Sequence, residues 1–423
     1  MSRITLIAQG TRGDAQPAVA LGKALQAQGH RVRVLASANF AAWIAAHGLE
    51  AAVSTVDIQA LMLSSGGQEW VESGHNPLAE VRAMKRLFAE HGWGLIRDAW
   101  EAAQDADLLL SSFTSDAFAL SIAEKLRIPH ASMLGQPALL ATRHGASLPN
   151  APLPGRVSLI NYLFGKLVLE PFPWQMQGAL INRLRREVLN LPPQTRRENT
   201  AARRRMLTLL GYSPRVVPHP PDWPPNTHPT GYWFLDEHTG WQPPDALQAF
   251  LAAGAPPVVV GFGSMTGRNP RRITEIVAAA VRQAGVRAVL LSGWAELGQM
   301  ALPDSILCLP AAPHGWLFPR AAAVVHHGGA GTTAAGLRAG IPTVVVPHFA
   351  DQPFWGRRVH ALGVGPAPIP RAKLTPARLA AAMHTAVTDP AMRRRAADLG
   401  ATIRAEDGLE TAVALLDRHL TGK

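Results

Sequence analysis

The sequence has 423 residues, of which 47% are hydrophobic and 17% are charged, and its formal net charge is +11. This length can bury two cores, and the composition excludes a largely disordered chain. A single cysteine, Cys308, excludes an intrachain disulfide, and no apolar run has the length of a membrane-spanning helix. We therefore expect two domains in a cytoplasmic protein.

The positive charge is compatible with nucleic acid, anionic lipid or a nucleotide diphosphate as partner. The sequence contains no recognised nucleic-acid-binding module and no basic helix interleaved with aromatic residues, so we expect no nucleic-acid partner. An arginine-rich composition can also reflect genome bias alone.

The chain begins with alternating strand and helix patterns. Residues 4–8 predict an apolar strand, 9–17 a loop with two glycines, 18–28 a helix and 31–36 the next strand. This order indicates a right-handed parallel unit. The loop lacks the dinucleotide fingerprint GxGxxG, and it places Asp14 after the first strand.

The rest of the N-terminal half continues this alternation. We expect strands at 49–53, 107–111, 129–133 and 216–218, and helices at 42–47, 78–91, 95–103, 115–126 and 174–186. Residues 64–77 predict a loop. Asp105 and Asp107 have the spacing of a DxD metal motif, but they precede an apolar strand instead of following one, so we predict no metal there. Asp116 is expected to cap a helix.

An arginine-rich stretch extends from Arg183 to Arg205, where eight arginines accompany only Glu187 and Glu198. We favour a solvated helical face, and the alternative is a patch that contacts a membrane surface. The following residues, 213–244, are rich in proline and tryptophan and predict an interdomain linker.

The C-terminal half repeats the alternation. We expect strands at 257–261, 287–291, 306–309, 322–326, 341–346 and 364–368, and helices at 270–283, 331–339, 376–387, 391–403 and 409–420. Strands that alternate with helices of this length predict a second parallel sheet.

Residues 322–356, AAVVHHGGAGTTAAGLRAGIPTVVVPHFADQPFWG, are the most specific part of the sequence. A strand leads through glycines to a helix N-terminus, where unpaired amides and the macrodipole favour an anion. His327 and two threonines add donors, and Asp351 and Gln352 follow the next strand. A phosphate site followed by a sugar-binding pair is what an enzyme that uses nucleotide sugars needs.

This block resembles the donor-binding signature of the UDP-glycosyltransferase superfamily, especially its sterol and macrolide–glycopeptide glycosyltransferase branch. The resemblance implies an α/β protein of the GT-B fold, with two doubly wound Rossmann-like domains that face each other across a cleft. It implies an acceptor domain at 1–212, the linker at 213–244, a nucleotide-sugar domain at 245–390, and C-terminal helices at 391–423 that pack back on the first domain.

The resemblance also assigns roles to residues. Asp14, in the segment GTRGD, matches the catalytic aspartate of the family. The residues implied to bind the donor are Ser264, Trp294, Ala312, His314, His327, Gly329, Ala330, Gly331, Thr332, Thr333, Asp351 and Gln352. Trp294 would stack on uracil or serve only in packing. Ala311 stands where plant relatives have a Trp that stacks on the base, and Ala335 stands where they have a Glu that binds the ribose. Neither of these contacts can therefore be carried over from the plant enzymes. We expect UDP in preference to TDP.

The implied reaction is inverting transfer of a hexose, expected to be glucose, from a UDP-sugar to a hydroxyl of a sterol- or hopanoid-like, polyketide or phenolic acceptor. Asp14 would remove the acceptor proton while amides, hydroxyls and His327 stabilise the departing diphosphate, so we expect no metal and no other cofactor. The alternatives are a glycolipid synthase of the rhamnolipid type with a TDP-sugar, a nucleotide-sugar 2-epimerase and a non-catalytic binding protein. We expect a monomer or weak dimer, with peripheral membrane contact left open.

Overall fold

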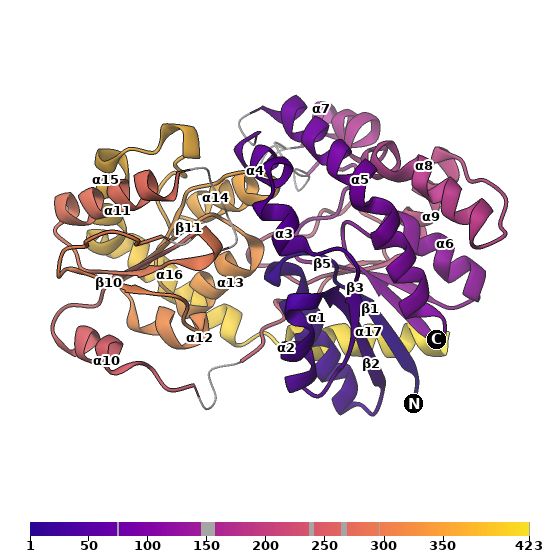
Figure 1. Ribbon diagram of the computed structural model, residues 1–423, viewed down its shortest axis with the longest axis horizontal. Helices are drawn as coiled ribbons and strands as arrows, with labels where there is room; N and C mark the ends of the chain where they lie inside the picture. Colours follow the sequence, from indigo (N-terminus) through magenta and orange to yellow (C-terminus); the bar gives the residue numbers. More distant parts are fainter. Residues whose placement is uncertain (74–75, 145–156, 237–240, 264–268, 296, 423) are drawn as a thin grey trace. The chain divides into compact units, whose positions relative to one another are not determined.

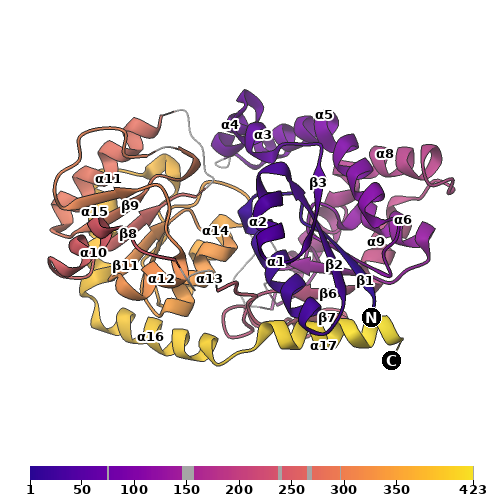
Figure 2. The same ribbon diagram turned by 60° about the horizontal axis from the view of Figure 1, so that its bottom comes forward.

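The computed structural model describes residues 1–73, 76–144, 157–236, 241–263, 269–295 and 297–422. They form two compact units, and each unit contains one parallel sheet covered by helices (Figures 1 and 2). Unit 1 comprises Met1–Gly67, Val81–Leu235 and Asp407–Lys423, and unit 2 comprises Gln68–Glu80 and Asp236–Glu406. The two doubly wound sheets that the sequence predicts are therefore present.

Within the described residues, unit 1 has a seven-stranded sheet in which neighbouring strands are parallel. In spatial order the strands are β3 (Glu50–Ser54), β2 (Arg31–Ser37), β1 (Arg3–Ile7), β4 (Leu108–Ser111), β5 (His130–Leu134), β6 (Leu207–Leu210) and β7 (Thr227–Pro229). The order reverses between β1 and β4. The loops after these two strands therefore diverge, which is where open α/β sheets bind ligands.

The strand expected at residues 216–218 is wrong. The amides of Val216 and Val217 both donate to the carbonyl of Ser213, at 3.0 Å each, and so form a turn. Strands β6 and β7, which the sequence analysis did not predict, complete the sheet instead.

Most of the expected linker, residues 213–244, is folded into unit 1, which extends to Leu235. Trp223 and Trp233 are buried, and the indole of Trp233 donates to the hydroxyl of Thr230 at 2.9 Å. Buried tryptophan rings are typical of a folded core, so these residues are part of the core of unit 1 and not of a linker.

The helices of unit 1 are α1 (Arg12–Ala27), α2 (Ala41–Ala46), α3 (Ile58–Leu63), α6 (Asp116–Leu126), α7 (Leu159–Phe164), α8 (Phe172–Glu187), α9 (Arg196–Arg205) and α17 (Gly408–Thr421). Helix α5 (Pro77–Ala103) begins in unit 2 and continues in unit 1. It replaces the two separate helices expected at 78–91 and 95–103. Gly92 does not interrupt it because the missing side chain allows close packing: a Cβ there would lie 2.8 Å from Cδ1 of Leu180.

Residues 64–77, expected as a loop, contain helix α4 (Ser65–Glu72). Val71 on this helix is 1% exposed. Burial of this side chain outweighs the low helix propensity of the two glycines at 66–67.

The arginine-rich stretch is only partly a solvated face. Arg185 is 3% exposed and its Nη1 lies 2.6 Å from Oε2 of Glu124. Arg203 donates to the carbonyl of Glu170, and Arg204 pairs with the Glu170 carboxylate. These arginines hold α8 and α9 to neighbouring elements, so the expectation of a fully solvated face is wrong for them.

Within the described residues, unit 2 has a five-stranded parallel sheet. In spatial order its strands are β10 (Ile306–Leu309), β9 (Ala288–Leu291), β8 (Val258–Gly261), β11 (Ala323–His326) and β12 (Thr343–Val345). Its helices, besides α4, are α10 (Asp245–Ala252), α11 (Pro270–Ala284), α12 (His314–Leu317), α13 (Ala330–Ala339), α14 (Gln352–Ala361), α15 (Pro376–Thr388) and α16 (Pro390–Arg404).

Residues 364–368 do not form the expected strand. The segment runs beside β12. The amide of Thr343 donates to the carbonyl of Val364 at 3.1 Å, and the amide of Ile369 donates to the carbonyl of Val345 at 3.0 Å. The prolines between these two bonds lack amide hydrogens, and the ladder is therefore interrupted.

The C-terminal helices divide between the units, whereas residues 391–423 were expected to pack together on the first domain. Helix α16 packs on α13 in unit 2, where a Cβ at Gly400 would lie 2.6 Å from Cα of Gly340. Helix α17 packs on α1 in unit 1, and its Asp417 lies 3.2 Å from Nε2 of His30.

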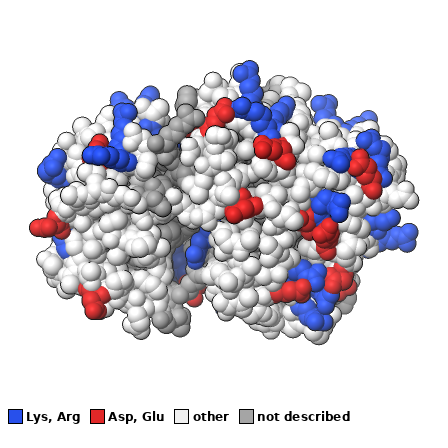
Figure 3. Space-filling model, in the orientation of Figure 1, with Lys and Arg blue, Asp and Glu red and all other residues white. Residues whose placement is uncertain are grey.

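Charged side chains of both signs are interspersed on the face shown in Figure 3. Of the helices in the described parts of the chain, none has the length and apolarity needed to cross a membrane.

Candidate active site

The carboxyl ends of the strands of unit 2 lie at one edge of its sheet, because all five are parallel. The strand order reverses between β8 and β11, which makes this pair the switch point of the sheet. Gly263, which follows β8, has a φ of +60°. A Cβ at Gly263 would lie 3.3 Å from Cε1 of His327, so the loops after β8 and β11 meet at this point.

Helix α13 begins at the switch point. Gly329 is its N-cap, and no side chain in the described ranges caps the helix. Within the described residues the amides of Ala330, Gly331 and Thr332 have no hydrogen-bond acceptor, and a Cβ at Gly331 would have no neighbour within 4 Å. Unpaired amides at an open helix N-terminus favour an anion.

His327 stands over this helix terminus. A Cβ at Gly329 would lie 2.5 Å from Nε2 of His327, so only glycine leaves room for the ring. His327 is 9% exposed, and its Nδ1 is buried without a hydrogen-bond partner among the described residues. Burial, assisted by the neighbouring His314, lowers the pKa of His327 to about 4. At neutral pH the ring is therefore uncharged and donates a single hydrogen bond.

His326, the other histidine of the pair, has a structural role. Its Nδ1 accepts the amide hydrogen of Gly328 at 2.9 Å, so Nε2 carries the ring proton. The side chain is fully buried, and burial lowers the pKa of His326 well below its ordinary value. This hydrogen bond fixes the glycine turn that leads into α13.

The two threonines of α13 differ. Thr332 is partly exposed at the helix terminus. Thr333 is fully buried, and both its hydroxyl and its amide donate to the carbonyl of Gly329 at 2.9 Å. The expected donation from Thr333 to a diphosphate is therefore wrong, because that hydroxyl proton is used within the first turn.

Asp351 and Gln352 follow β12. Gln352 is 4% exposed, and its Oε1 accepts the amide hydrogens of His348 at 2.8 Å and Phe349 at 3.3 Å. This oxygen therefore holds the loop between β12 and α14. The sequence analysis, which assigned Gln352 to the sugar, did not predict this role. Asp351 is partly exposed, and its Oδ2 accepts from the indole of Trp355 at 2.8 Å.

The remaining predicted donor residues lie at the same sheet edge, except that Ser264 falls outside the described residues. The amide of Trp294, after β9, donates to the carbonyl of Gly263 at 3.2 Å. His314 begins α12 and stacks on Phe318, with ring centroids 4.4 Å apart. Ala312 packs against the hydrophobic core of unit 2.

Asp14 lies at the corresponding edge of unit 1, after β1. Helix α1 begins at Arg12 instead of residue 18, because Thr11 and Asp14 form a capping box. Oδ2 of Asp14 accepts the amide hydrogen of Thr11 at 2.9 Å, and a Cβ at Gly10 would lie 2.1 Å from that oxygen.

The carboxylate of Asp14 is half-buried, and its Oδ1 has no hydrogen-bond partner within the described residues. Burial raises the pKa of Asp14, and the Thr11 hydrogen bonds oppose this effect. An oxygen that is unpaired and more basic than in an ordinary aspartate can accept a proton.

Asp116 does not cap α6, as the sequence analysis expected. Its Oδ1 accepts from the hydroxyl of Ser111 at 2.5 Å and its Oδ2 from Ser132 at 2.7 Å. The Ser111 hydroxyl also lies 2.7 Å from Nε2 of His130. Burial raises the pKa of Asp116 to about 6 and lowers that of His130 to about 3. Sequence reasoning missed this network because its members come from β4, β5 and α6.

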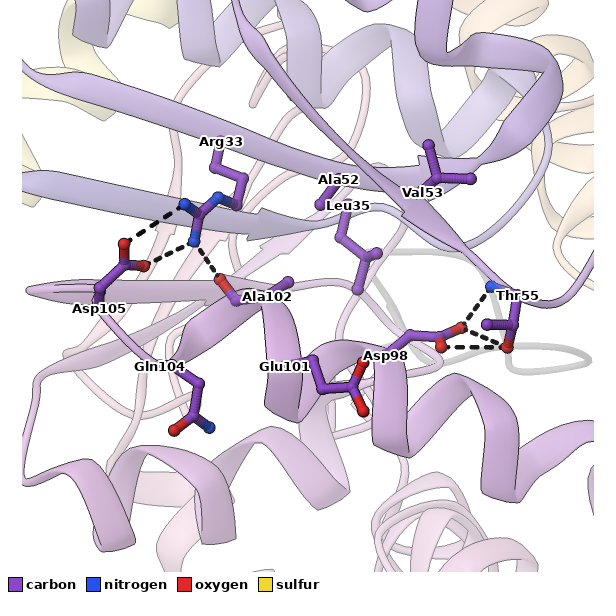
Figure 4. A pocket seen from close by; sticks show the side chains of 10 residues that line it. All are labelled: Arg33, Leu35, Ala52, Val53, Thr55, Asp98, Glu101, Ala102, Gln104 and Asp105. Atoms are coloured by element: carbon purple, nitrogen blue, oxygen red, sulfur yellow. Dashed lines mark hydrogen bonds and ion pairs between the residues drawn. The ribbon is translucent and has the colours of Figure 1, made fainter.

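The DxD-like pair is structural. Asp105 pairs with Arg33 at 2.6 Å, and Asp107 accepts the amide hydrogen of Arg3 at 2.7 Å. Arg33 and Asp105 line a cavity of about 460 Å³ in unit 1 (Figure 4). Asp98, which also lines it, bonds to Thr55 at 2.8 Å, so these polar groups are satisfied by one another. In the described parts of the chain, no group of three or more His, Cys, Asp or Glu is placed to hold a metal ion.

Two family models match the chain. The glycosyltransferase family 28 N-terminal domain matches residues 4–131, which include Asp14. The C-terminal domain of the erythromycin biosynthesis protein CIII-like family matches residues 291–413, which include His327 and Asp351.

Curated relatives and solved structures agree with these matches. The sterol 3-beta-glucosyltransferase of Neosartorya fischeri is 38% identical over 99% of this chain, and the chain spans 29% of that protein. The crystal structure of a glycotransferase of kitacinnamycin has a TM-score of 0.72 at 20% identity and covers 99% of both chains. The glycosyltransferase VinC in complex with dTDP has a TM-score of 0.66 at 20% identity and covers 100% of both. At this identity the structures show the fold alone.

Proposed function

Because the chain belongs to the UDP-glycosyltransferase superfamily and has its GT-B fold, we propose that it transfers a hexose from a nucleotide sugar to a hydrophobic acceptor. The donor is UDP-glucose, the acceptor is a sterol or a similar polycyclic alcohol, and the anomeric configuration inverts. The similarity to sterol 3-beta-glucosyltransferases supports this acceptor class over polyketides and phenolics. The relatives described above support neither an epimerase nor a non-catalytic protein.

The observation that carries the proposal is the open N-terminus of α13 with the neutral ring of His327 above it. The unpaired amides bind the diphosphate, and Nε2 of His327 donates one further hydrogen bond. These donors are in place before the reaction, so they stabilise the negative charge that develops on the leaving group without reorganisation.

The acceptor is activated by Asp14. Its free Oδ1 takes the proton of the acceptor hydroxyl as that oxygen bonds to the anomeric carbon. The bond from this carbon to the diphosphate breaks, and UDP leaves with its negative charge held at the helix terminus. Burial, which raises the pKa of Asp14, makes the carboxylate a stronger base than an ordinary aspartate.

We propose that no metal ion takes part, because the helix terminus and His327 supply the charge stabilisation that a cation gives in other phosphate sites. Transfer should then be unchanged by EDTA and by added magnesium. We also propose that the enzyme works as a monomer or weak dimer in the cytoplasm, where its single cysteine stays reduced.

A donor and acceptor screen tests the function. UDP- and TDP-linked glucose, galactose and rhamnose are combined with a sterol, a hopanoid, a macrolide, a flavonoid and a hydroxy-lipid, and nucleotide release and product mass are measured. UDP release that requires both UDP-glucose and the sterol, with one hexose added to the sterol, is expected. Conversion of the UDP-sugar without acceptor would indicate an isomerase, and binding without any turnover would contradict a transferase.

A further inference from the structure

A segment from early in the chain contacts the loop that precedes Asp351. Residues 68–80 belong to unit 2. The ring of Trp70 lies 4.9 Å from that of Phe349, and Oε1 of Glu80 accepts the amide hydrogen of Ala350 at 3.0 Å. The loop between β12 and α14 is thus held by residues about 270 positions earlier.

The residue held by Glu80 has an uncommon backbone. Ala350 has a φ of +55°, a left-handed conformation that a residue with a Cβ adopts at a cost. The preceding amides, of His348 and Phe349, donate to Oε1 of Gln352. Two side-chain oxygens, from Gln352 and Glu80, therefore accept three consecutive amide hydrogens, and only Glu80 comes from a distant part of the chain.

A backbone hydrogen bond holds the start of the same loop. The amide of Arg371 donates to the carbonyl of Pro347 at 3.3 Å. Burial lowers the pKa of Arg371, and the nearby charge of Glu72 opposes this effect. The loop that leads into Asp351 is thus held near its start by Arg371 and near its end by Trp70 and Glu80.

We propose that Glu80 is a positioning residue for recognition of the donor sugar. It holds Ala350 in the left-handed conformation, and this sets the direction of the next peptide and of the Asp351 side chain. The inference rests on the proposed function, because it takes Asp351 as a ligand of the hexose. It adds a specificity determinant that lies outside the C-terminal donor block.

Four variants test the inference: Glu80→Ala, Glu80→Gln, Ala350→Gly and the double variant Glu80→Ala/Ala350→Gly. Calorimetry measures the Kd of UDP and of UDP-glucose for each. Glu80→Ala should weaken UDP-glucose about tenfold, an effect of the size of one hydrogen bond to a charged group, and leave UDP unchanged. Glu80→Gln should bind almost normally, since its carbonyl oxygen can accept the same amide hydrogen.

The double variant should recover much of the lost affinity, because glycine adopts this φ without a Cβ penalty. Thermal unfolding should show the same compensation, and Glu90→Ala, on the exposed side of α5, is the control. Equal losses for UDP and UDP-glucose, or a double variant no better than Glu80→Ala, would overturn the inference while leaving the proposed function intact. A wild-type protein that binds neither ligand would instead refute the proposed function, and the inference with it.

Discussion

Replacing His327 removes a side-chain hydrogen-bond donor from the proposed anion site at the N-terminus of α13. The ring is neutral at pH 7 because its pKa is lowered to about 4, so it can contribute one hydrogen bond to a charged phosphate. Such a bond is worth about 1.5–3 kcal/mol, which corresponds to roughly 10- to 150-fold in Kd. His327→Ala should therefore weaken UDP binding by that factor in calorimetric titrations.

The donating nitrogen can also be identified. Nε2 faces Gly329 at the helix terminus, whereas Nδ1 is buried and has no hydrogen-bond partner in the part of the chain that the structure describes. His327→Gln places an amide near the position of Nε2 and should keep more affinity than His327→Asn, which mimics Nδ1. His384→Ala, on the exposed side of α15, is the control. Unchanged UDP affinity in His327→Ala, or an equal loss in His384→Ala, would refute the reasoning.

Two further predictions concern the sugar and the buried network. Asp351→Asn should cost more affinity for UDP-glucose than for UDP in calorimetry, and equal losses would place Asp351 in the scaffold. Burial raises the pKa of Asp116 from 3.8 to about 6, so its stabilising contribution is complete below about pH 3.8 and is lost as pH rises through 6. The free energy of unfolding of the wild type, measured with urea, should fall by about 2–3 kcal/mol relative to that of Asp116→Asn between about pH 4 and pH 8. A difference between the two proteins that stays constant with pH would contradict this pKa.

The fold class and most central strands could be predicted from the sequence, because buried parallel strands such as β4 and β11 are short apolar runs with little ambiguity. The confirmed family resemblance rests on residues 322–356, whose glycines and polar residues follow strands at fixed spacing. The donor-site roles themselves stay predictions, apart from the correction at Thr333.

Several of the errors share one physical origin, because tertiary packing overrode local propensity. Gly92 predicts a helix break, yet its lack of a side chain lets Leu180 approach and keeps α5 continuous. Aspartate is a residue type that often caps helices, yet the carboxylate of Asp116 instead accepts hydrogen bonds from serines on two strands. The contact of Glu80 with Ala350 has no local signal at all, because about 270 residues separate the partners.

The proton acceptor is the central claim, and Asp14→Asn tests it most directly. Asparagine can accept the amide hydrogen of Thr11 as Oδ2 does, so α1 keeps its cap, but it cannot take a proton from the acceptor. The variant should bind UDP normally in calorimetry while UDP release with UDP-glucose and a sterol falls by about 10²–10⁴-fold. Turnover close to wild type would contradict the account and leave Asp14 as a helix cap.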